Sequence, residues 1–501
     1  MDITPLLRAY ANIRLAALAR LDPAEVQART LLALVRRARH TRFGRDHGFE
    51  RIRSVAEYQA MVPLRRHAEF WRDYWQAPFP RLEDVTWPGT IPLLAQTSGT
   101  ASGSSKSVPV SAAMLAANRR AALDVLVHHL ARRPRSRVLA GPTFMLGGST
   151  ALETLAPGIR RGDLSAIAAC TVPAWARPWS FPPPELALDT DWERKIARLA
   201  KAVPAGRVRA VAGTPGWLLA FLERLGGSFA AMFPRLEMVV HGGVGFAPYR
   251  ARFGALMAGG GAETAEVYPA SEGFVALADG GDGEGLRMQI DNGLFFELVP
   301  AAEVGSPAPT RHWLATAQPG IDYALVLTTC AGLWSYVLGD TVRLTGLKPP
   351  RLLVSGRLGI MLNAVGEHLS GQQLDDAVAA AGGQVSDYAV GVRFAETGVP
   401  RHVFVVEFPG PIPVDFSTRL DAALAAGSLD YRERRAGSVA LAAPELVPVP
   451  PGFFAAWMKR RGRLGGQNKV PRIADGAMLE ELLATAPTPP PPPAGAGSPP
   501  R

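Results

Sequence analysis

The residues with the richest chemistry lie in one loop. Residues 95–106 combine six hydroxyl side chains, two glycines and one lysine, between apolar runs at 91–94 and 108–110. Glycine lets a backbone turn tightly and bring its N–H groups close to an anion. Hydroxyls donate hydrogen bonds without charge, and a lysine adds a mobile cation. This composition is typical of a loop that holds a polyphosphate.

Two other interpretations of this loop compete with that one. A P-loop requires G-x-x-x-x-G-K-[ST] at the start of a helix, but here the second glycine position is Ser104. Pro109 instead predicts a strand over 107–110, so that the loop joins two strands. A flexible Ser/Gly linker is the other alternative. Linkers seldom lie between two apolar strands, which favours a phosphate loop of non-Walker type.

A second motif combines Tyr268, Ser271 and Glu272. The ring could stack on a base, and the carboxylate could hold Mg²⁺ beside phosphates, since Mg²⁺ prefers one or two carboxylates plus substrate oxygens. Tyrosines near glutamates are common, so this motif alone does not decide the function.

Two further motifs could complete a nucleotide site. Gly339-Asp340 follows an apolar run and is predicted to lie on a turn, where Asp340 could accept from both ribose hydroxyls. Such charge-assisted bonds contribute about 1.5–3 kcal/mol each. An Asx-turn between strands is the structural alternative. Lys469 lies in a glycine-flanked loop and could reach an active site, although alone it would be an ordinary exposed lysine.

Composition excludes several classes of protein. The chain has 501 residues, 48% of them hydrophobic and 20% charged, which fits a globular protein of two or three domains. We expect no membrane association, because no run of about 18 apolar residues occurs. The net charge is +10, but the basic residues are scattered along the sequence, so no nucleic acid partner is expected. Cys170 and Cys330 predict neither a disulfide nor a zinc site, and a cytoplasmic location follows. The start of the chain does not have the pattern of a secretory signal.

The pattern of apolar residues predicts an α/β fold in two domains. Helices are expected within 5–40 and at 124–133, 192–203, 371–381 and 417–426; strands are expected at 138–140, 210–212, 238–240, 325–329, 388–392 and 403–408. The pattern resets near 346, which predicts a large domain at 1–346 and a smaller α/β domain at 347–484. The proline-rich end, 485–501, is predicted to be disordered.

The order of these pieces identifies a family resemblance. The Ser/Thr/Gly loop is followed by Y-x-x-S-E, T-T-x-A-G-L-x-x-Y-x-x-G-D, G-R with N-x-x-G-E, and Q-x-K-x-P-R. This order resembles the auxin-responsive Gretchen Hagen family of acyl acid–amido synthetases, in the adenylate-forming superfamily of acyl-CoA synthetases and luciferases. The resemblance implies a large N-terminal domain of mixed sheets and helices and a smaller, mobile α/β C-terminal domain.

The resemblance also implies roles for single residues. Tyr268 would lie against adenine, Ser271 and Glu272 near the phosphates and Mg²⁺, and Asp340 and Arg357 at the ribose. Lys469, from the mobile domain, would stabilise charge during adenylation. The residues that would hold the ATP phosphates are Ser98, Gly99, Thr100, Ser102, Gly103 and Lys106. The chain departs from many members at Val337, where they carry arginine, and at His368, where they carry a lysine with a phosphate role.

The implied reaction has two steps. ATP would adenylate a carboxylic acid with release of pyrophosphate, and an amine, expected to be an amino acid, would then take the acyl group. An acyl-CoA ligase and a nucleotide-binding homologue without turnover remain alternatives. A monomer is expected. The apolar segments after 112 and near Met145, Trp217 and Val244 favour an aryl or alkyl acid. The run 241–245 resembles an esterase oxyanion segment, but no G-x-S-x-G elbow follows it.

Overall fold

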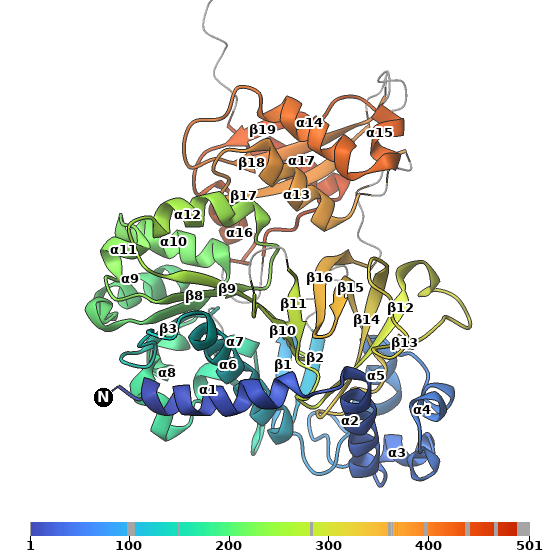
Figure 1. The fold of residues 1–501 in the computed structure, drawn as a ribbon. Helices are drawn as coiled ribbons and strands as arrows, with labels where there is room; N and C mark the ends of the chain where they lie inside the picture. The colour runs from blue at the N-terminus through green and yellow to red at the C-terminus, as the bar shows by residue number, and fades with distance from the viewer. Residues whose placement is uncertain are drawn as a thin grey trace, which may run out of the picture. The chain divides into compact units, whose positions relative to one another are not determined.

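The computed structural model describes residues 2–97, 106–148, 151–280, 284–358, 362, 364–365, 367, 369–394, 399–435, 441–464 and 469–487. The chain is of the mixed α/β class, which confirms the predicted fold class (Figure 1). It divides into two compact units, one within 1–246, 253–359 and 465–469, the other within 247–252, 360–464 and 470–501. The domain boundaries expected from the sequence stay predictions.

The N-terminal unit is built on a sheet of twelve strands. One half is parallel, and its strands lie in the order β9 (Glu263–Ala270), β8 (Met238–Gly242), β7 (Ala210–Gly213), β3 (Thr143–Leu146) and β6 (Ser180–Phe181). The carboxyl ends of parallel strands meet at one edge of a sheet, and α/β proteins bind ligands there. This carboxyl edge carries the turns after Leu146, Gly213, Gly242 and Ala270.

The other half of the sheet is antiparallel. Its strands, in chain order, are β10 (Gly273–Leu277), β11 (Leu286–Met288), β12 (Leu294–Pro300), β13 (His312–Trp313), β14 (Asp322–Thr329), β15 (Tyr336–Leu347) and β16 (Pro350–Arg357). The central strands β12 and β14 are almost entirely buried, as their continuous apolar sequences require. β10 follows β9 after two residues and joins the two halves.

A second sheet carries the strands on either side of the predicted phosphate loop. Its strands lie in the order β2 (Lys106–Val110), β1 (Leu93–Thr97), β5 (Ile159–Gly162) and β4 (Glu153–Ala156). β1 and β2 are antiparallel, with Thr97 paired to Lys106. The loop therefore joins two strands, which confirms that prediction and excludes a P-loop.

Helices surround these sheets, and most of those that the sequence predicts are present. The principal ones are α1 (Thr4–Ala19), α2 (Pro23–Ala38), α3 (Arg42–Asp46), α4 (Val55–Met61), α5 (His67–Phe70), α6 (Ala112–Arg132), α7 (Leu164–Cys170), α8 (Pro184–Ala187), α9 (Trp192–Ala202), α10 (Pro215–Leu225), α11 (Phe229–Met232) and α12 (Arg250–Met257). Ser111 and Asp191 cap α6 and α9 by accepting a backbone N–H from the first turn.

One predicted strand is wrong. Residues 138–140 form turns, with the Ala140 N–H bonded to the Arg137 carbonyl. Val138 is buried without pairing in a sheet. A three-residue apolar run marks burial but does not by itself select a strand.

The C-terminal unit is a three-stranded sheet covered on both faces. Its elements are β17 (Asp387–Arg393), β18 (Arg401–Glu407), β19 (Glu445–Val449), α13 (Gly371–Ala381), α14 (Phe416–Gly427), α15 (Leu429–Arg435), α16 (Phe453–Arg460) and α17 (Gly476–Thr485). Along β18, Phe404 and Val406 enter one apolar cluster, while Val403 and Val405 enter the other. This two-residue period buries both faces of the strand.

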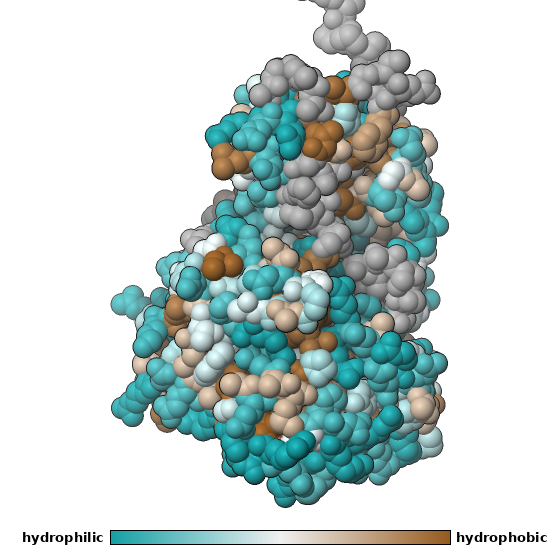
Figure 2. Space-filling model, turned by 90° about the vertical axis from the view of Figure 1, so that its right-hand side faces the viewer, coloured by the Kyte–Doolittle hydropathy of each residue, from teal (hydrophilic) through white to brown (hydrophobic). Residues whose placement is uncertain are grey.

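The surface is what the composition predicts for a globular chain. The face in Figure 2 is mostly hydrophilic, with apolar side chains scattered over it. Within the described ranges, no helix has both the length and the apolar character to cross a bilayer.

Candidate active site

Lys469 lies at the carboxyl edge of the parallel strands. Its ammonium group donates to the carbonyl oxygen of Gly243, the residue after β8. Gly243 has φ +88°, a left-handed conformation that favours glycine, and a Cβ there would lie 3.0 Å from the lysine Nζ. The turn after β8 thus has the backbone shape that admits the lysine.

The turn after β7 adds a hydroxyl to this edge. A Cβ at Gly243 would lie 3.5 Å from the Thr214 methyl group, so Thr214 is adjacent to Gly243. The Thr214 hydroxyl is buried and has no hydrogen-bond partner among the described residues. A buried hydroxyl without a partner is costly, so it favours a ligand that supplies one.

Three side chains, from β9, β15 and β16, form a hydrogen-bonded group. The Tyr268 hydroxyl on β9 donates to Asp340 Oδ2 at 2.5 Å, and Arg357 Nε donates to Asp340 Oδ1 at 2.8 Å. Asp340 and Arg357 face each other across β15 and β16. The group places an aromatic ring, a carboxylate and a guanidinium together, a combination that can bind a nucleoside.

Asp340 does not lie on a turn, which corrects the prediction. It is part of β15, at a bulge where Val326 pairs with Val337 while Ala324 pairs with Thr341. Gly339 takes φ +98° within this bulge. A bulge turns a side chain out of the regular alternation without ending the strand, and bulges are common beside active sites.

Glu272 follows β9 and is buried, with 8% of its surface exposed. Burial raises the pKa of its carboxyl group to about 7, and the neighbouring Asp340 carboxylate adds to the rise. A hydrogen bond from the Tyr336 hydroxyl and the charge of Arg357 oppose it. The carboxyl group is therefore poised between its two protonation states near neutral pH.

We predict that Glu272→Gln changes how stability depends on pH. The folded pKa is about 7, above the ordinary value of 4.5, so the folded state holds the proton more tightly over that range. This contribution is present below pH 4.5 and is lost as pH rises through 7, by up to about 3 kcal/mol. Urea unfolding without nucleotide should show wild type losing stability against the variant between pH 5 and 8.

The control for this prediction is Glu480→Gln, at an exposed position on α17. That variant should follow the wild-type pH dependence. Parallel pH profiles for wild type and Glu272→Gln would contradict the raised pKa.

Part of the predicted site lies outside the described residues. This applies to Ser98, Gly99, Thr100, Ser102, Gly103 and His368. Lys106 is described: it begins β2, and its charge, together with burial as the larger effect, lowers the pKa of His67. His67 is in turn bonded through Nε2 to the Ser107 carbonyl, 3.1 Å away.

Val337, a departure from the family pattern, has a structural role here. Its side chain is buried in a small apolar cluster with Val299, Ala324 and Val326. Two other residues of the candidate site were not predicted from the sequence. Tyr336 and Gly243 both lie in segments that carry the family resemblance, but neither was given a role.

A serine, a histidine and a glutamate also form a chain of hydrogen bonds. His129 Nε2 is 2.8 Å from Ser136 Oγ, and His129 Nδ1 is 2.6 Å from Glu263 Oε1. The His129 side chain is fully buried, and Arg132 and Arg133 also bind Glu263. The group joins the end of α6 to the start of β9, and it gives no substrate access to a serine nucleophile.

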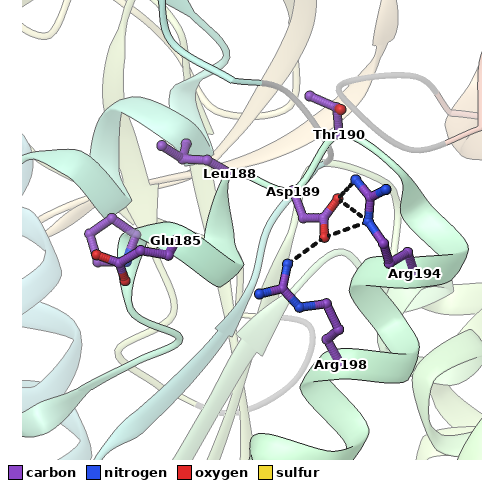
Figure 3. Close-up of a pocket in the computed structure, with 7 residues that line it drawn as sticks. Glu185, Leu188, Asp189, Thr190, Arg194 and Arg198 are labelled. Carbon is purple, nitrogen blue, oxygen red and sulfur yellow. Dashed lines mark hydrogen bonds and ion pairs between the residues drawn. The ribbon is translucent and has the colours of Figure 1, made fainter.

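A surface hollow lies elsewhere, between α8 and the start of α9. Its volume is about 550 Å³. In Figure 3, Asp189 stands between two arginines: Arg194 Nη2 is 2.6 Å from Oδ1, and Arg198 Nη1 is 2.9 Å from Oδ2. Both guanidinium groups are thus turned to Asp189. None of the residues singled out by the motifs lines this hollow.

Family models match three parts of the chain. They are described as the GH3 family N-terminal domain at residues 15–146, the GH3 family central domain at 287–357 and the GH3 family C-terminal domain at 372–477. Together they span more than half of the sequence.

Curated relatives match over a shorter region. Indole-3-acetic acid-amido synthetase GH3.3 of Arabidopsis thaliana is 28% identical over 213 residues, which are 38% of this chain and 35% of that protein. The GH3 domain-containing protein of Homo sapiens is 32% identical over 204 residues, 40% of this chain and 38% of that protein. The matched region spans little more than a third of either relative.

Solved structures share the fold at low sequence identity. The acyl acid amido synthetase GH3.15 in complex with 2,4-DB has a TM-score of 0.79 at 15% identity, covering 95% of this chain and 96% of that one. A 2-hydroxyisobutyryl-CoA ligase in complex with 2-HIB-AMP has a TM-score of 0.58 at 15% identity, covering 91% of each chain.

Proposed function

Because this chain belongs to the GH3 family, we propose that it activates a carboxylic acid with ATP and transfers the acyl group to an amine. The acid becomes an acyl-adenylate with release of pyrophosphate, and an amino acid then attacks the adenylate with release of AMP. The observation that carries the proposal is the group of Tyr268, Asp340 and Arg357, in the same unit as Glu272 and Lys469.

The nucleoside would bind at the hydrogen-bonded group. Asp340 accepts two hydrogen bonds from side chains of this unit, one of them from the cation of Arg357. These bonds fix its orientation, and a fixed acceptor for the ribose hydroxyls would lose little entropy on binding. The Tyr268 ring is held by the same bond and would lie against the adenine.

The adenylation step needs positive charge where negative charge develops. A carboxylate is a weak nucleophile and the α-phosphate is surrounded by negative oxygens, so the step depends on electrostatic stabilisation and alignment. Lys469 carries a point charge to the carboxyl edge, and Lys106 stands at the end of the phosphate loop. These two lysines would share the charge of the phosphates.

The residues present also suit a magnesium ion. Glu272 is a buried carboxyl group near a second carboxylate, Asp340; burial raises its pKa, and repulsion from Asp340 adds to the rise. A dication would relieve that repulsion. The described residues hold no group of three or more metal-binding side chains, which fits Mg²⁺ held by one or two carboxylates plus phosphate oxygens. When bound, Mg²⁺ would neutralise phosphate charge.

The expected setting is a monomer in the cytoplasm that acts on small molecules, without nucleic acid or membrane. Cys170 and Cys330 are both unpaired thiols in the structure. Free thiols fit a reducing compartment.

The experiment that tests the proposal is acid-dependent exchange of labelled pyrophosphate into ATP, across a panel of aryl and alkyl acids. Exchange with at least one acid is expected. Amino acids and CoA are then compared as acceptors, with amide as the expected product and thioester as the outcome that favours an acyl-CoA ligase. ATP binding without exchange for any acid would contradict the proposal and favour a nucleotide-binding homologue.

A further inference from the structure

Lys195 on α9 is a buried lysine that the proposed reaction does not use. Only 1% of its surface is exposed. Its ammonium group donates to three backbone carbonyls: those of Gly147 at 3.2 Å, of Ala187 at 2.6 Å and of Gly148. A lysine has three N–H groups to donate, and all three find acceptors here.

Burial makes the charged form of Lys195 less favourable. Burial lowers the pKa of Lys195 to about 8, and the attraction of Asp163 and Asp189 opposes this change only in part. A buried cation that hydrogen-bonds carbonyls is not needed for packing, because an apolar side chain of similar volume would fill the same space. The three carbonyl bonds are therefore the feature to explain.

The turn that Lys195 binds is fixed from its other side as well. Ser165 Oγ accepts the Gly148 N–H at 3.0 Å and donates to Asp163 Oδ1 at 2.7 Å. A Cβ at Gly147 would lie 2.7 Å from Ser165 Oγ, so only glycine allows this approach. The turn 147–148 is thus clamped between α9 and α7.

This turn lies on the carboxyl edge of the parallel strands. It follows β3, whose last residue, Leu146, pairs with Gly213 of β7, and Gly213 pairs with His241 of β8. The next turns along that edge carry Thr214 and then Gly243, which binds Lys469. A ligand that extended from the proposed nucleotide site along this edge would therefore meet the turn 147–148.

Two aspartates that precede α9 hold the start of this helix in place. Asp191 caps the helix by accepting the Arg194 N–H at 3.0 Å, and Asp189 binds the Arg194 and Arg198 side chains (Figure 3). Lys195 therefore projects from a rigid first turn, which limits its freedom to leave the carbonyls.

We propose that Lys195 is a positioning residue for the acyl acid, which sets the shape of the turn 147–148 as one wall of the acid pocket. The inference rests on the proposed function and adds a determinant of acid selectivity to it. Since all three ammonium protons are used by backbone carbonyls, Lys195 acts through the turn and does not contact the acid.

The test compares Lys195→Met, which keeps length and removes the three donors, with wild type. We expect KM for the acid to rise about tenfold, because a misplaced wall disturbs alignment of the substrate. KM for ATP should stay within about twofold, since the nucleotide contacts lie on other strands. The ratio of kcat/KM between a small acid such as benzoate and a large one such as indole-3-acetate should change in the same variant.

Ser165→Ala is the second, milder variant. It removes one acceptor from the opposite side of the same turn, and should raise KM for the acid about threefold without affecting KM for ATP. Lys201→Met is the matched control, because it makes the same substitution at an exposed lysine of the same helix. Its KM for the acid should equal that of wild type.

The outcomes separate the two proposals. Wild type without acid-dependent exchange would overturn the proposed function itself. Wild type with exchange, but a folded Lys195→Met with unchanged KM for the acid and unchanged selectivity, would overturn the inference alone. A rise of both KM values together would mean general damage, and would also overturn it. Should Lys195→Met not fold by circular dichroism, an unchanged KM for the acid in Ser165→Ala would overturn the inference in its place.

Discussion

Asp340→Ala should reduce acid-dependent pyrophosphate exchange by about 10²–10⁴-fold, the value of two charge-assisted hydrogen bonds to ribose. The variant removes the acceptor and also leaves the Tyr268 hydroxyl and Arg357 without their common partner. The loss should be in kcat/KM for ATP, measured with the acid at saturation. Asp340→Asn should retain part of the activity, because an amide oxygen still accepts from Arg357 but carries no charge.

Asp322→Ala is the matched control for this experiment. Asp322 lies on β14 of the same sheet and is also paired with an arginine, Arg343, at 2.6 Å, but this pair is exposed. Exposed ion pairs contribute about 0–1 kcal/mol, so exchange should be nearly unchanged. Equal losses in Asp322→Ala and Asp340→Ala would show that disturbance of the sheet, and not the ribose contact, causes the effect.

Lys469→Ala should remove most of the adenylation activity, by about 10²–10³-fold, which is typical for loss of one group that stabilises a transition state. The lysine side chain reaches Gly243 at the carboxyl edge, where in the proposed reaction it would balance the charge of the leaving pyrophosphate. The reaction of a supplied acyl-adenylate with the amino acid should remain within about threefold of wild type, because that step transfers no phosphate.

The two half-reactions make this prediction specific. Lys348→Ala, at an exposed lysine 3.9 Å from Asp22, should leave both steps unchanged. If Lys469→Ala slows the transfer step as much as adenylation, the lysine has a structural role and not a role in adenylation. Full exchange activity in Lys469→Ala would remove it from the site altogether.

Local sequence signals predicted helices correctly where capping residues mark the helix ends. The helix at 371–381 has Ser370 as its N-cap, with Gln373 completing a capping box, and ends at Gly382 with φ +81°. The helix at 192–203 begins after Asp191, another capping residue. In both helices the capping residues bond to backbone groups only a few positions away. The signal therefore lies within a short stretch of sequence.

Features that depend on pairing between distant segments were not predictable in the same way. The turn expected at Gly339-Asp340 is a bulge, because β15 pairs with β14 on both sides of it. The partnership of Asp340 and Arg357 comes from the register of β15 against β16. Nothing within either segment fixes that register.

The same difference applies to the candidate site: local motifs name some of its residues, and only the structure identifies the others. The motifs named Tyr268, Glu272 and Asp340, and the structure brings them together. The motifs gave no role to Thr214, whose buried hydroxyl is identified only by the partner it lacks among the described residues. The phosphate loop residues between Thr97 and Lys106 stay a prediction of the sequence alone.

The carboxyl edge of the sheet also has a consequence for redesign. The turn after β3 belongs to a different βα connection from the turn after β8, with one parallel strand between them. Under the proposed function, substitutions at positions that flank Gly147 should therefore leave the nucleotide site intact. If the turn 147–148 forms a wall of the acid pocket as proposed, a library confined to that connection should change which acids are accepted and leave the nucleotide-binding residues unchanged.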